Sequence, residues 1–246
     1  MSKRINFFLK HLLISFIIAF IAVIVVFIFW YPSPLATAMG VTKIFLMLIL
    51  IDVIVGPLLT LLVYKEGKKT LKLDISVIVI LQLLALAFGL YNIEQGRPVW
   101  LAFQNNQFEL VRHNDIIYSN NSSENEKYTH VNWLGPQFIG VNTGKTDKDK
   151  SKMLMREMST GIMVAYRPEL YMPIEESATQ LLKEKRDLQV LKIFNEEDQV
   201  TAVVGRYPDA VGWLPLRVLT GIDMVVLIDK HGMVLGIADL RPWKLS

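Results

Sequence analysis

A short polar series interrupts the second of three long apolar runs in this sequence. The stretch Ile51–Thr60, which reads IDVIVGPLLT, carries Asp52, Gly56 and Thr60 at positions i, i+4 and i+8. In a helix these three residues share one face. A carboxyl group, a gap that admits a neighbouring backbone and a hydroxyl group would then form one stripe. Ionisable residues inside membrane segments usually face protein or water, so Asp52 is a candidate functional residue.

Two interpretations of this stripe stay open. Counted from the loop that joins the second and third apolar runs, Asp52 and Gln82 lie at similar depths, because a helix rises about 1.5 Å per residue. A hydrogen bond between them inside the bundle would explain both polar residues, with Gly56 as a packing gap and Pro57 as a local kink. Alternatively, the stripe contacts the helix of another protein. Both can hold if Gly56 and Thr60 serve the partner while Asp52 is satisfied internally.

The elements that must position this stripe are three predicted transmembrane helices, at about 12–30, 41–63 and 73–91. The first run contains 19 residues with Ser15 as its one polar side chain, which is long enough to cross a hydrocarbon core of about 30 Å. A cleaved signal peptide is the alternative, because Ala36-Thr37-Ala38 fits a cleavage pattern, but the apolar run exceeds the usual length. The sequence therefore predicts a membrane region at 1–91 and a second domain at 92–246.

Charge predicts the orientation of these helices. Residues 1–91 contain 8 Lys and Arg against 3 Asp and Glu, whereas residues 92–246 contain 18 against 20. The basic residues gather in the N-terminal tail and in the loop at 65–72, and both segments belong in the cytoplasm by the positive-inside rule. Three crossings then place the C-terminal domain outside, which is the periplasm of a bacterium with two membranes. The basic surplus flanks a lipid bilayer, and no nucleic-acid partner is expected.

The sequence offers little for catalysis. It contains no cysteine, which excludes thiol chemistry, disulfides and thiolate zinc sites. Its four histidines lack metal-ligand spacing, although His113, Asp115 and His130 could converge in space. No GxGxxG, GxSxG or Walker-type loop is present. We expect no catalytic residue, no metal and no cofactor.

The C-terminal 155 residues predict one α+β domain. Strands are expected at 98–103, 108–112, 138–141 and 161–166, and a hairpin of strands at 224–228 and 233–237 around a turn that ends in glycine. Helices are expected at 147–158 and 173–186, the latter because acidic residues precede basic ones. The stretch 188–194 fits a helix or a strand. A surface loop is expected around 120–123.

With these features the chain resembles the type IV pilin accessory proteins, the TfpX/TfpZ group related to the fimbrial assembly protein FimB. The resemblance spans essentially the whole chain. It is carried by the three-helix membrane region with IDVIVGPLLT, by one segment just after the third helix and by another near the C-terminus. Those two segments contain Arg97, Pro98, Trp100, Phe103, Gly212, Trp213 and Pro215.

The resemblance implies a bacterial inner-membrane protein that acts beside a type IV pilin, as a non-catalytic, chaperone-like accessory to pilin stability and pilus assembly or dynamics. The major pilin would be the main partner, and other inner-membrane assembly proteins are possible partners. Two alternatives remain from the residues alone. One is a membrane-anchored receptor whose periplasmic domain binds a small ligand, although the chain offers no cytoplasmic output domain. The other is a pilin-modifying enzyme, for which no acidic cluster lies near the outer interface.

Overall fold

A computed structural model describes residues 2–118, 126–144 and 146–244. Contacts between Cα atoms divide the chain into two compact units. The first consists of residues 1–36 and 40–96, and the second of residues 37–39 and 97–246. The surface loop expected around 120–123 lies outside the described residues.

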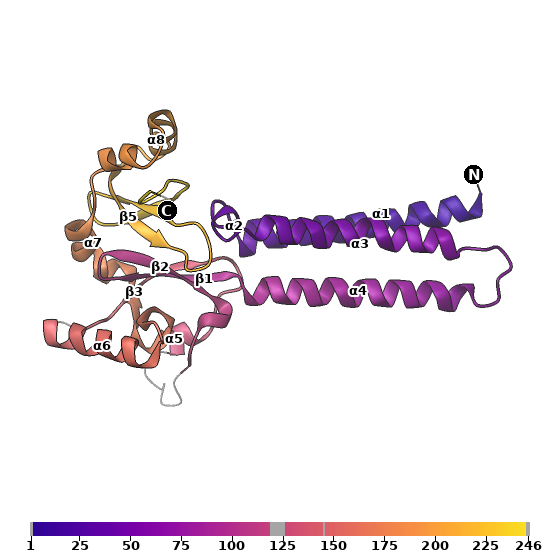
Figure 1. Cartoon of the computed structure of the whole chain (residues 1–246), viewed down its shortest axis with the longest axis horizontal. Helices are drawn as coiled ribbons and strands as arrows, with labels where there is room; N and C mark the ends of the chain where they lie inside the picture. The colour runs from indigo at the N-terminus through magenta and orange to yellow at the C-terminus, as the bar shows by residue number, and fades with distance from the viewer. Residues whose placement is uncertain (1, 119–125, 145, 245–246) are drawn as a thin grey trace. The chain divides into compact units, whose positions relative to one another are not determined.

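Three long apolar helices form the first unit (Figure 1). They are α1 (Lys3–Ile24), α3 (Val41–Val63) and α4 (Leu71–Gln95). Helix α1 continues to Trp30 as the π-helix Val25–Trp30, in which Tyr31 N donates to Val26 O at 2.7 Å. A short helix, α2 (Leu35–Ala38), follows. All three long helices have the length and composition to cross a membrane, which confirms the expected membrane anchor.

The outer surface of these helices is apolar. Large exposed side chains such as Met47, Leu62 and Phe88 cover it, with exposed fractions of 65%, 67% and 71%. An aqueous protein would bury such side chains, whereas lipid accepts them. Polar groups lie inside the bundle or at its ends, where Arg4 Nε donates to Leu61 O at 2.7 Å. The unit therefore has the surface of a membrane-embedded bundle.

A seven-stranded mixed sheet forms the framework of the second unit, in the order β4-β3-β1-β2-β5-β6-β7. Its strands are β1 (Pro98–Gln104), β2 (Gln107–Arg112), β3 (Gln137–Val141), β4 (Tyr171–Pro173), β5 (Ala210–Arg217), β6 (Met224–Asp229) and β7 (Val234–Ala238). Strands β1 and β2 form a hairpin, as do β6 and β7, while β3 runs parallel to β1 and β5 parallel to β2. Five expected strands are thus confirmed, and the α+β fold class with them.

The sheet has two halves, because the β2–β5 ladder contains only the pairs Phe108–Leu216 and Glu109–Arg217. Each half has its own apolar core. One core gathers around Trp100 and Tyr171, whose rings meet edge to face at 5.7 Å between centroids. The other gathers around Trp213, which is fully buried. This division places the midpoint of the sheet beside Glu109.

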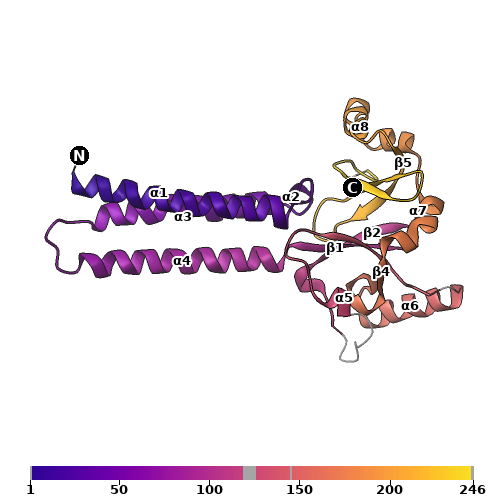
Figure 2. The same cartoon turned by 180° about the vertical axis from the view of Figure 1, so that it is seen from behind.

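Helices flank the sheet. In both views α5 (Glu126–Thr129) and α6 (Asp147–Thr160) lie on one side and α8 (Glu197–Val204) lies at the opposite end (Figures 1 and 2). Helix α7 (Ala178–Glu184) follows the 3-10 helix Ile174–Ser177. Further 3-10 helices span His113–Asp115, Val164–Tyr166, Pro168–Leu170 and Leu188–Ile193.

Two expectations for this unit need correction. The strand expected at 161–166 is wrong, because Gly161 ends α6 in the left-handed conformation and Val164–Tyr166 forms a 3-10 turn. The helix expected at 173–186 is shorter, because it begins with 3-10 geometry and Lys185 is extended before Arg186 bridges to Trp213. The ambiguous stretch 188–194 is a 3-10 helix at Leu188–Ile193.

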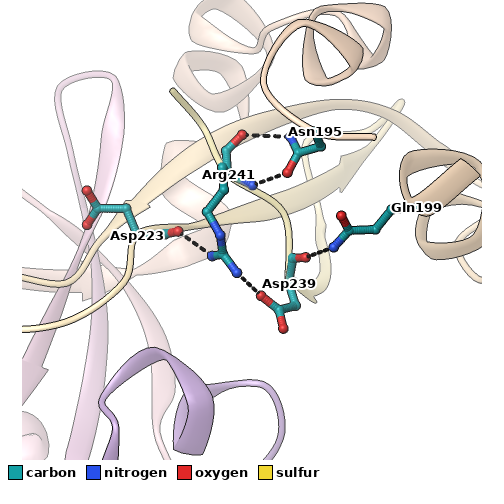
Figure 3. A network of polar contacts seen from close by, with 5 residues as sticks. All are labelled: Asn195, Gln199, Asp223, Asp239 and Arg241. Carbon is teal, nitrogen blue, oxygen red and sulfur yellow. Dashed lines mark hydrogen bonds and ion pairs between the residues drawn. The ribbon is translucent and has the colours of Figure 1, made fainter. Parts of the chain in front are cut away.

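A polar network holds the C-terminal segment of the second unit in place (Figure 3). The amide of Asn195 donates to Arg241 O at 2.9 Å and accepts from Arg241 N at 2.7 Å. The guanidinium group of Arg241 donates to Asp223 O and forms an ion pair with Asp239, whose own carbonyl accepts from Gln199. The last strand is thereby tied to α8 and to the 3-10 helix before it.

Candidate functional site

Gln82 of α4 joins all three membrane helices. Its Nε2 donates to Ser15 Oγ of α1 at 3.0 Å and to Asp52 O of α3 at 2.9 Å. The contact with Asp52 therefore uses the backbone carbonyl oxygen. Ser15 is 2% exposed and Asp52 is 7% exposed, so the bonds lie inside the bundle. In an apolar surrounding such bonds have no competition from water, and they hold the helices in register.

Gly56 provides the space for this side chain. A Cβ atom at position 56 would lie 1.9 Å from Gln82 Oε1 and 2.4 Å from Gln82 Cδ, so a larger residue there would displace the Gln82 amide. The next residue, Pro57, is also buried within α3 and has no N–H to donate to the preceding turn. Gly56 is thus a point of α3 against which the Gln82 side chain of α4 packs.

Thr60 lies one turn further along α3 and is fully buried. Its Oγ1 lies 2.8 Å from Nδ1 of His11 on α1, within hydrogen-bonding distance. The stripe formed by Asp52, Gly56 and Thr60 therefore faces the other two helices of its own bundle in this structure. His11 was not singled out from the sequence. It is four residues before Ser15, and this spacing on α1 was the available signal.

The bundle carries two hollows. A cavity of about 240 Å³ between α3 and α4 is lined by Asp52, Gly56 and Gln82 among apolar neighbours. A larger groove of about 610 Å³ lies between α1 and α3 and is lined entirely by apolar side chains. Its walls are Phe16, Ala19, Phe20 and Val23 of α1 and Leu46, Met47, Ile49, Leu50, Val53 and Ile54 of α3. This groove is the larger of these two hollows.

The segment that begins at Arg97 forms the centre of one half of the sheet. Arg97 is 2% exposed, and its Nη1 donates to Asn132 O at 2.9 Å. Pro98 begins β1, where a missing N–H is tolerated. Trp100 and Phe103 are both 2% exposed and pack into the interior of the unit. These residues position β1 rather than present a surface.

The segment around Trp213 has the corresponding place in the other half. Its indole Nε1 donates to Asp187 O at 2.9 Å, and the Arg186 guanidinium carbon lies 5.1 Å from the ring centroid. A Cβ at Gly212 would lie 2.9 Å from Arg186 O, so only glycine allows this close approach. Pro215 is buried just before the β2–β5 ladder begins, where no hydrogen bond to β2 is required.

An unexpected acid lies at the junction of the two halves. Glu109 of β2 is 6% exposed and accepts a hydrogen bond from Gln107 Nε2 at 2.6 Å. Burial raises the pKa of Glu109 to about 7, and Arg217 nearby opposes this rise without cancelling it. Sequence reasoning missed this residue because the alternation Phe108, Glu109, Leu110 is that of a strand with one solvent-facing side.

The histidine and acid set considered for a metal does not form a site. Asp115 instead forms an ion pair with Arg112 at 2.7 Å between Nη2 and Oδ1. Within residues 2–118, 126–144 and 146–244, no three His, Cys, Asp or Glu side chains are arranged to hold a metal ion. The candidate sites are therefore the polar cluster inside the bundle and the one around Glu109, since the Asn195–Arg241 network is tied up in holding the C-terminal segment.

Comparison with known proteins places the chain in a family. The family described as "Fimbrial assembly protein FimB" matches residues 1–40. Three proteins of Dichelobacter nodosus are similar to the chain. The fimbrial assembly proteins of serogroups E1 and I are 26% and 25% identical to it over 90% of this chain and 89% of their own. That of serogroups C1 and C2 is 35% identical over 44% of this chain and 83% of its own.

The chain belongs to the FimB fimbrial assembly family. The FimB family match at residues 1–40 contains His11 and Ser15. These are the two α1 residues that bond to Thr60 and Gln82 inside the bundle. The serogroup E1 and I relatives extend the FimB likeness over both compact units. No solved structure matches the chain.

Proposed function

We propose that this protein is a non-catalytic accessory factor that supports a type IV pilin during pilus assembly. Membership of the FimB family carries the role in pilus assembly, and the likeness to the serogroup E1 relative covers 90% of the chain. The chaperone-like part of the proposal is that the protein holds the pilin in the membrane before the pilin enters a pilus. The polar side chains of the bundle support it, because they bond to one another and leave an apolar exterior for a partner.

The proposed location is the bacterial inner membrane. The N-terminus and the α3–α4 loop carry the basic residues and lie in the cytoplasm, so the second unit lies in the periplasm. This arrangement gives the protein one part in the bilayer and one part outside it. A pilin with a membrane helix and a periplasmic head could contact both.

The proposed membrane contact is the groove between α1 and α3. Its lining offers no hydrogen-bonding side chain, so inside a bilayer it accepts either acyl chains or an apolar helix of another protein. We assign it to the membrane helix of the pilin, since the FimB family supplies the assembly context. Gly56 and Thr60, the candidates from sequence, contribute indirectly by fixing how α1, α3 and α4 pack.

Co-purification tests this function. The full chain is extracted in mild detergent from cells that express the pilin of the same organism, and the pilin recovered with it is quantified. Leu50→Trp fills the groove from a position that is 59% exposed, and Leu84→Trp is the matched control on α4 at 62%. We expect Leu50→Trp to reduce pilin recovery several-fold and Leu84→Trp to leave it unchanged. Absence of pilin from the wild-type preparation would refute the proposed function itself.

A further inference from the structure

A polar groove crosses the second unit between the β1–β2 turn and α6. One part has a volume of about 480 Å³ and reaches from the turn to Arg217 of β5. A second part of about 250 Å³ continues toward Thr143 and Ser151. The two parts share Gln104, Asn105, Leu154 and Glu157, so together they form one elongated depression.

Glu109 lies in the wall of this groove with unused hydrogen-bonding capacity. An ionised carboxylate accepts up to about four hydrogen bonds, and Gln107 is the one hydrogen-bonding partner of Glu109 in the part of the chain that the structure describes. Arg217 is its neighbour in the β2–β5 register and acts on it through charge, while the side-chain hydrogen bond comes from Gln107. A buried acid in a strand of apolar residues costs stability, which is typical of a site that serves a ligand.

The other walls of the groove determine the class of ligand. Four consecutive amide side chains, at residues 104–107, border it and can bond the N–H and C=O groups of a backbone. Leu154, Met158 and Met163 form an apolar wall, and methionine adapts to varied side chains. Two acids, Glu109 and Glu157, face one base, Arg217. The groove therefore favours a ligand that is elongated, rich in backbone amides and positively charged.

We propose that this groove binds an extended polypeptide segment and seats one of its lysine or arginine side chains against Glu109. The ammonium or guanidinium group would supply the charge-assisted hydrogen bonds that Glu109 lacks. The proposal concerns the second unit alone and does not depend on the pilin contact in the membrane. Its ligand can belong to any polypeptide partner with an exposed basic segment.

The binding should depend on pH in one direction. The charged groups around Glu109 are Arg217 of β5, Glu157 of α6 and Asp223 after β5, with Tyr166 of the 3-10 turn also close. Because the pKa of Glu109 is raised to about 7, Glu109 is mainly neutral at pH 5.5 and mainly ionised at pH 8. A cationic side chain binds the ionised form, so affinity should rise with pH across this interval.

Fluorescence anisotropy with two labelled peptides tests the proposal on the full chain in detergent. The peptides are Ser-Gly-Lys-Gly-Ser and the same sequence with glutamine in place of lysine. At pH 8 we expect the lysine peptide to bind at least about tenfold more tightly than the glutamine peptide. At pH 5.5 the difference in affinity between the two peptides should be much smaller. Glu109→Gln should remove the advantage at both pH values, whereas Glu175→Gln, an exposed acid outside the groove, should preserve it.

Arg217→Gln provides an independent test that leaves the buried Glu109 side chain in place. Arg217 is exposed and competes for Glu109, so its removal should strengthen binding of the lysine peptide. Equal affinity of the wild type for both peptides, or no binding of either, overturns the proposal. A free acetyl-lysine methylamide that binds as tightly as the lysine peptide would overturn the polypeptide part of it.

Discussion

A single buried carboxyl group should make the second unit sensitive to pH. Unfolded chain releases the Glu109 proton near pH 4.5, whereas the folded chain retains it until about pH 7. Between these values the folded state binds more protons, so the free energy of unfolding falls as pH rises. The fall attributable to Glu109 is at most about 3 kcal/mol.

Urea denaturation of the full chain at pH 5 and pH 8, followed by tryptophan fluorescence, measures this effect. Glu109→Gln should flatten the difference between the two pH values and should be more stable than the wild type at pH 8. The exposed Glu175→Gln should keep the wild-type slope. An unchanged slope in Glu109→Gln would show that burial of this group does not control the pH dependence.

The sequence identified the polar residues inside the membrane bundle but not the buried acid Glu109 of the second unit. Asp52, Gly56 and Thr60 stood out because polar residues are rare in an apolar run, and Gln82 because its depth matched. Glu109 gave no such signal, since an acid between two apolar residues is ordinary in a half-exposed strand. The groove beside it is completed by α6, which is more than 35 residues away in the sequence, and local patterns do not report such packing.

Gly56 makes room on α3 for the Gln82 side chain of α4. Gly56→Ala would force the Gln82 amide away and break its bonds to Ser15 and Asp52, at a cost of about 1–3 kcal/mol. In a Gln82→Ala background the same change should cost much less, because the obstructing side chain is gone. Thermal unfolding of the four proteins in detergent gives the coupling energy. Additive effects would contradict the packing described for Gln82.

The hydrogen bonds from Asn195 to Arg241 should hold the C-terminal segment in place. Asn195→Ala removes two hydrogen bonds to the backbone of Arg241 (Figure 3), and we expect a loss of about 1–2 kcal/mol. Gln199→Ala removes one exposed bond to Asp239 and should cost less than half of that. Urea denaturation compares the two. An equal loss in both variants would show that Asn195 does not hold this segment.

The sequence predicted those helices and strands that have strong local sequence patterns. The long apolar runs predicted the membrane helices, and the apolar segments on either side of the turns at 104–107 and 229–232 predicted two pairs of strands. Strand β5 was not predicted because Gly212 and Pro215 interrupt its sequence pattern. In the structure Gly212 lies against Arg186 O, and Pro215 lies just before the β2–β5 ladder begins. The strand expected at 161–166 failed because Gly161 caps α6 and the chain turns immediately. The places of Gly212 and Pro215 are determined by long-range contacts, whereas Gly161 ends α6 through local geometry.

The proposed topology places α6 and the α3–α4 loop on opposite sides of the membrane. The chain contains no cysteine, so single cysteines report location without background. In spheroplasts, a membrane-impermeant maleimide should label Ser159→Cys on α6, which is exposed, and should label Lys69→Cys in the α3–α4 loop only after detergent is added. The reverse pattern would place the second unit in the cytoplasm and would contradict a periplasmic contact with pilin.

The proposed function requires that the membrane bundle of this FimB family member contacts a pilin directly. Site-specific photo-cross-linking measures this contact in living cells, with a benzophenone amino acid at Leu50 in the α1–α3 groove or at Leu84 on α4. Mass spectrometry then identifies any adduct. We expect a pilin adduct from position 50 and little or none from position 84. Adducts with lipid alone at position 50, with pilin present in the same membrane, would contradict it.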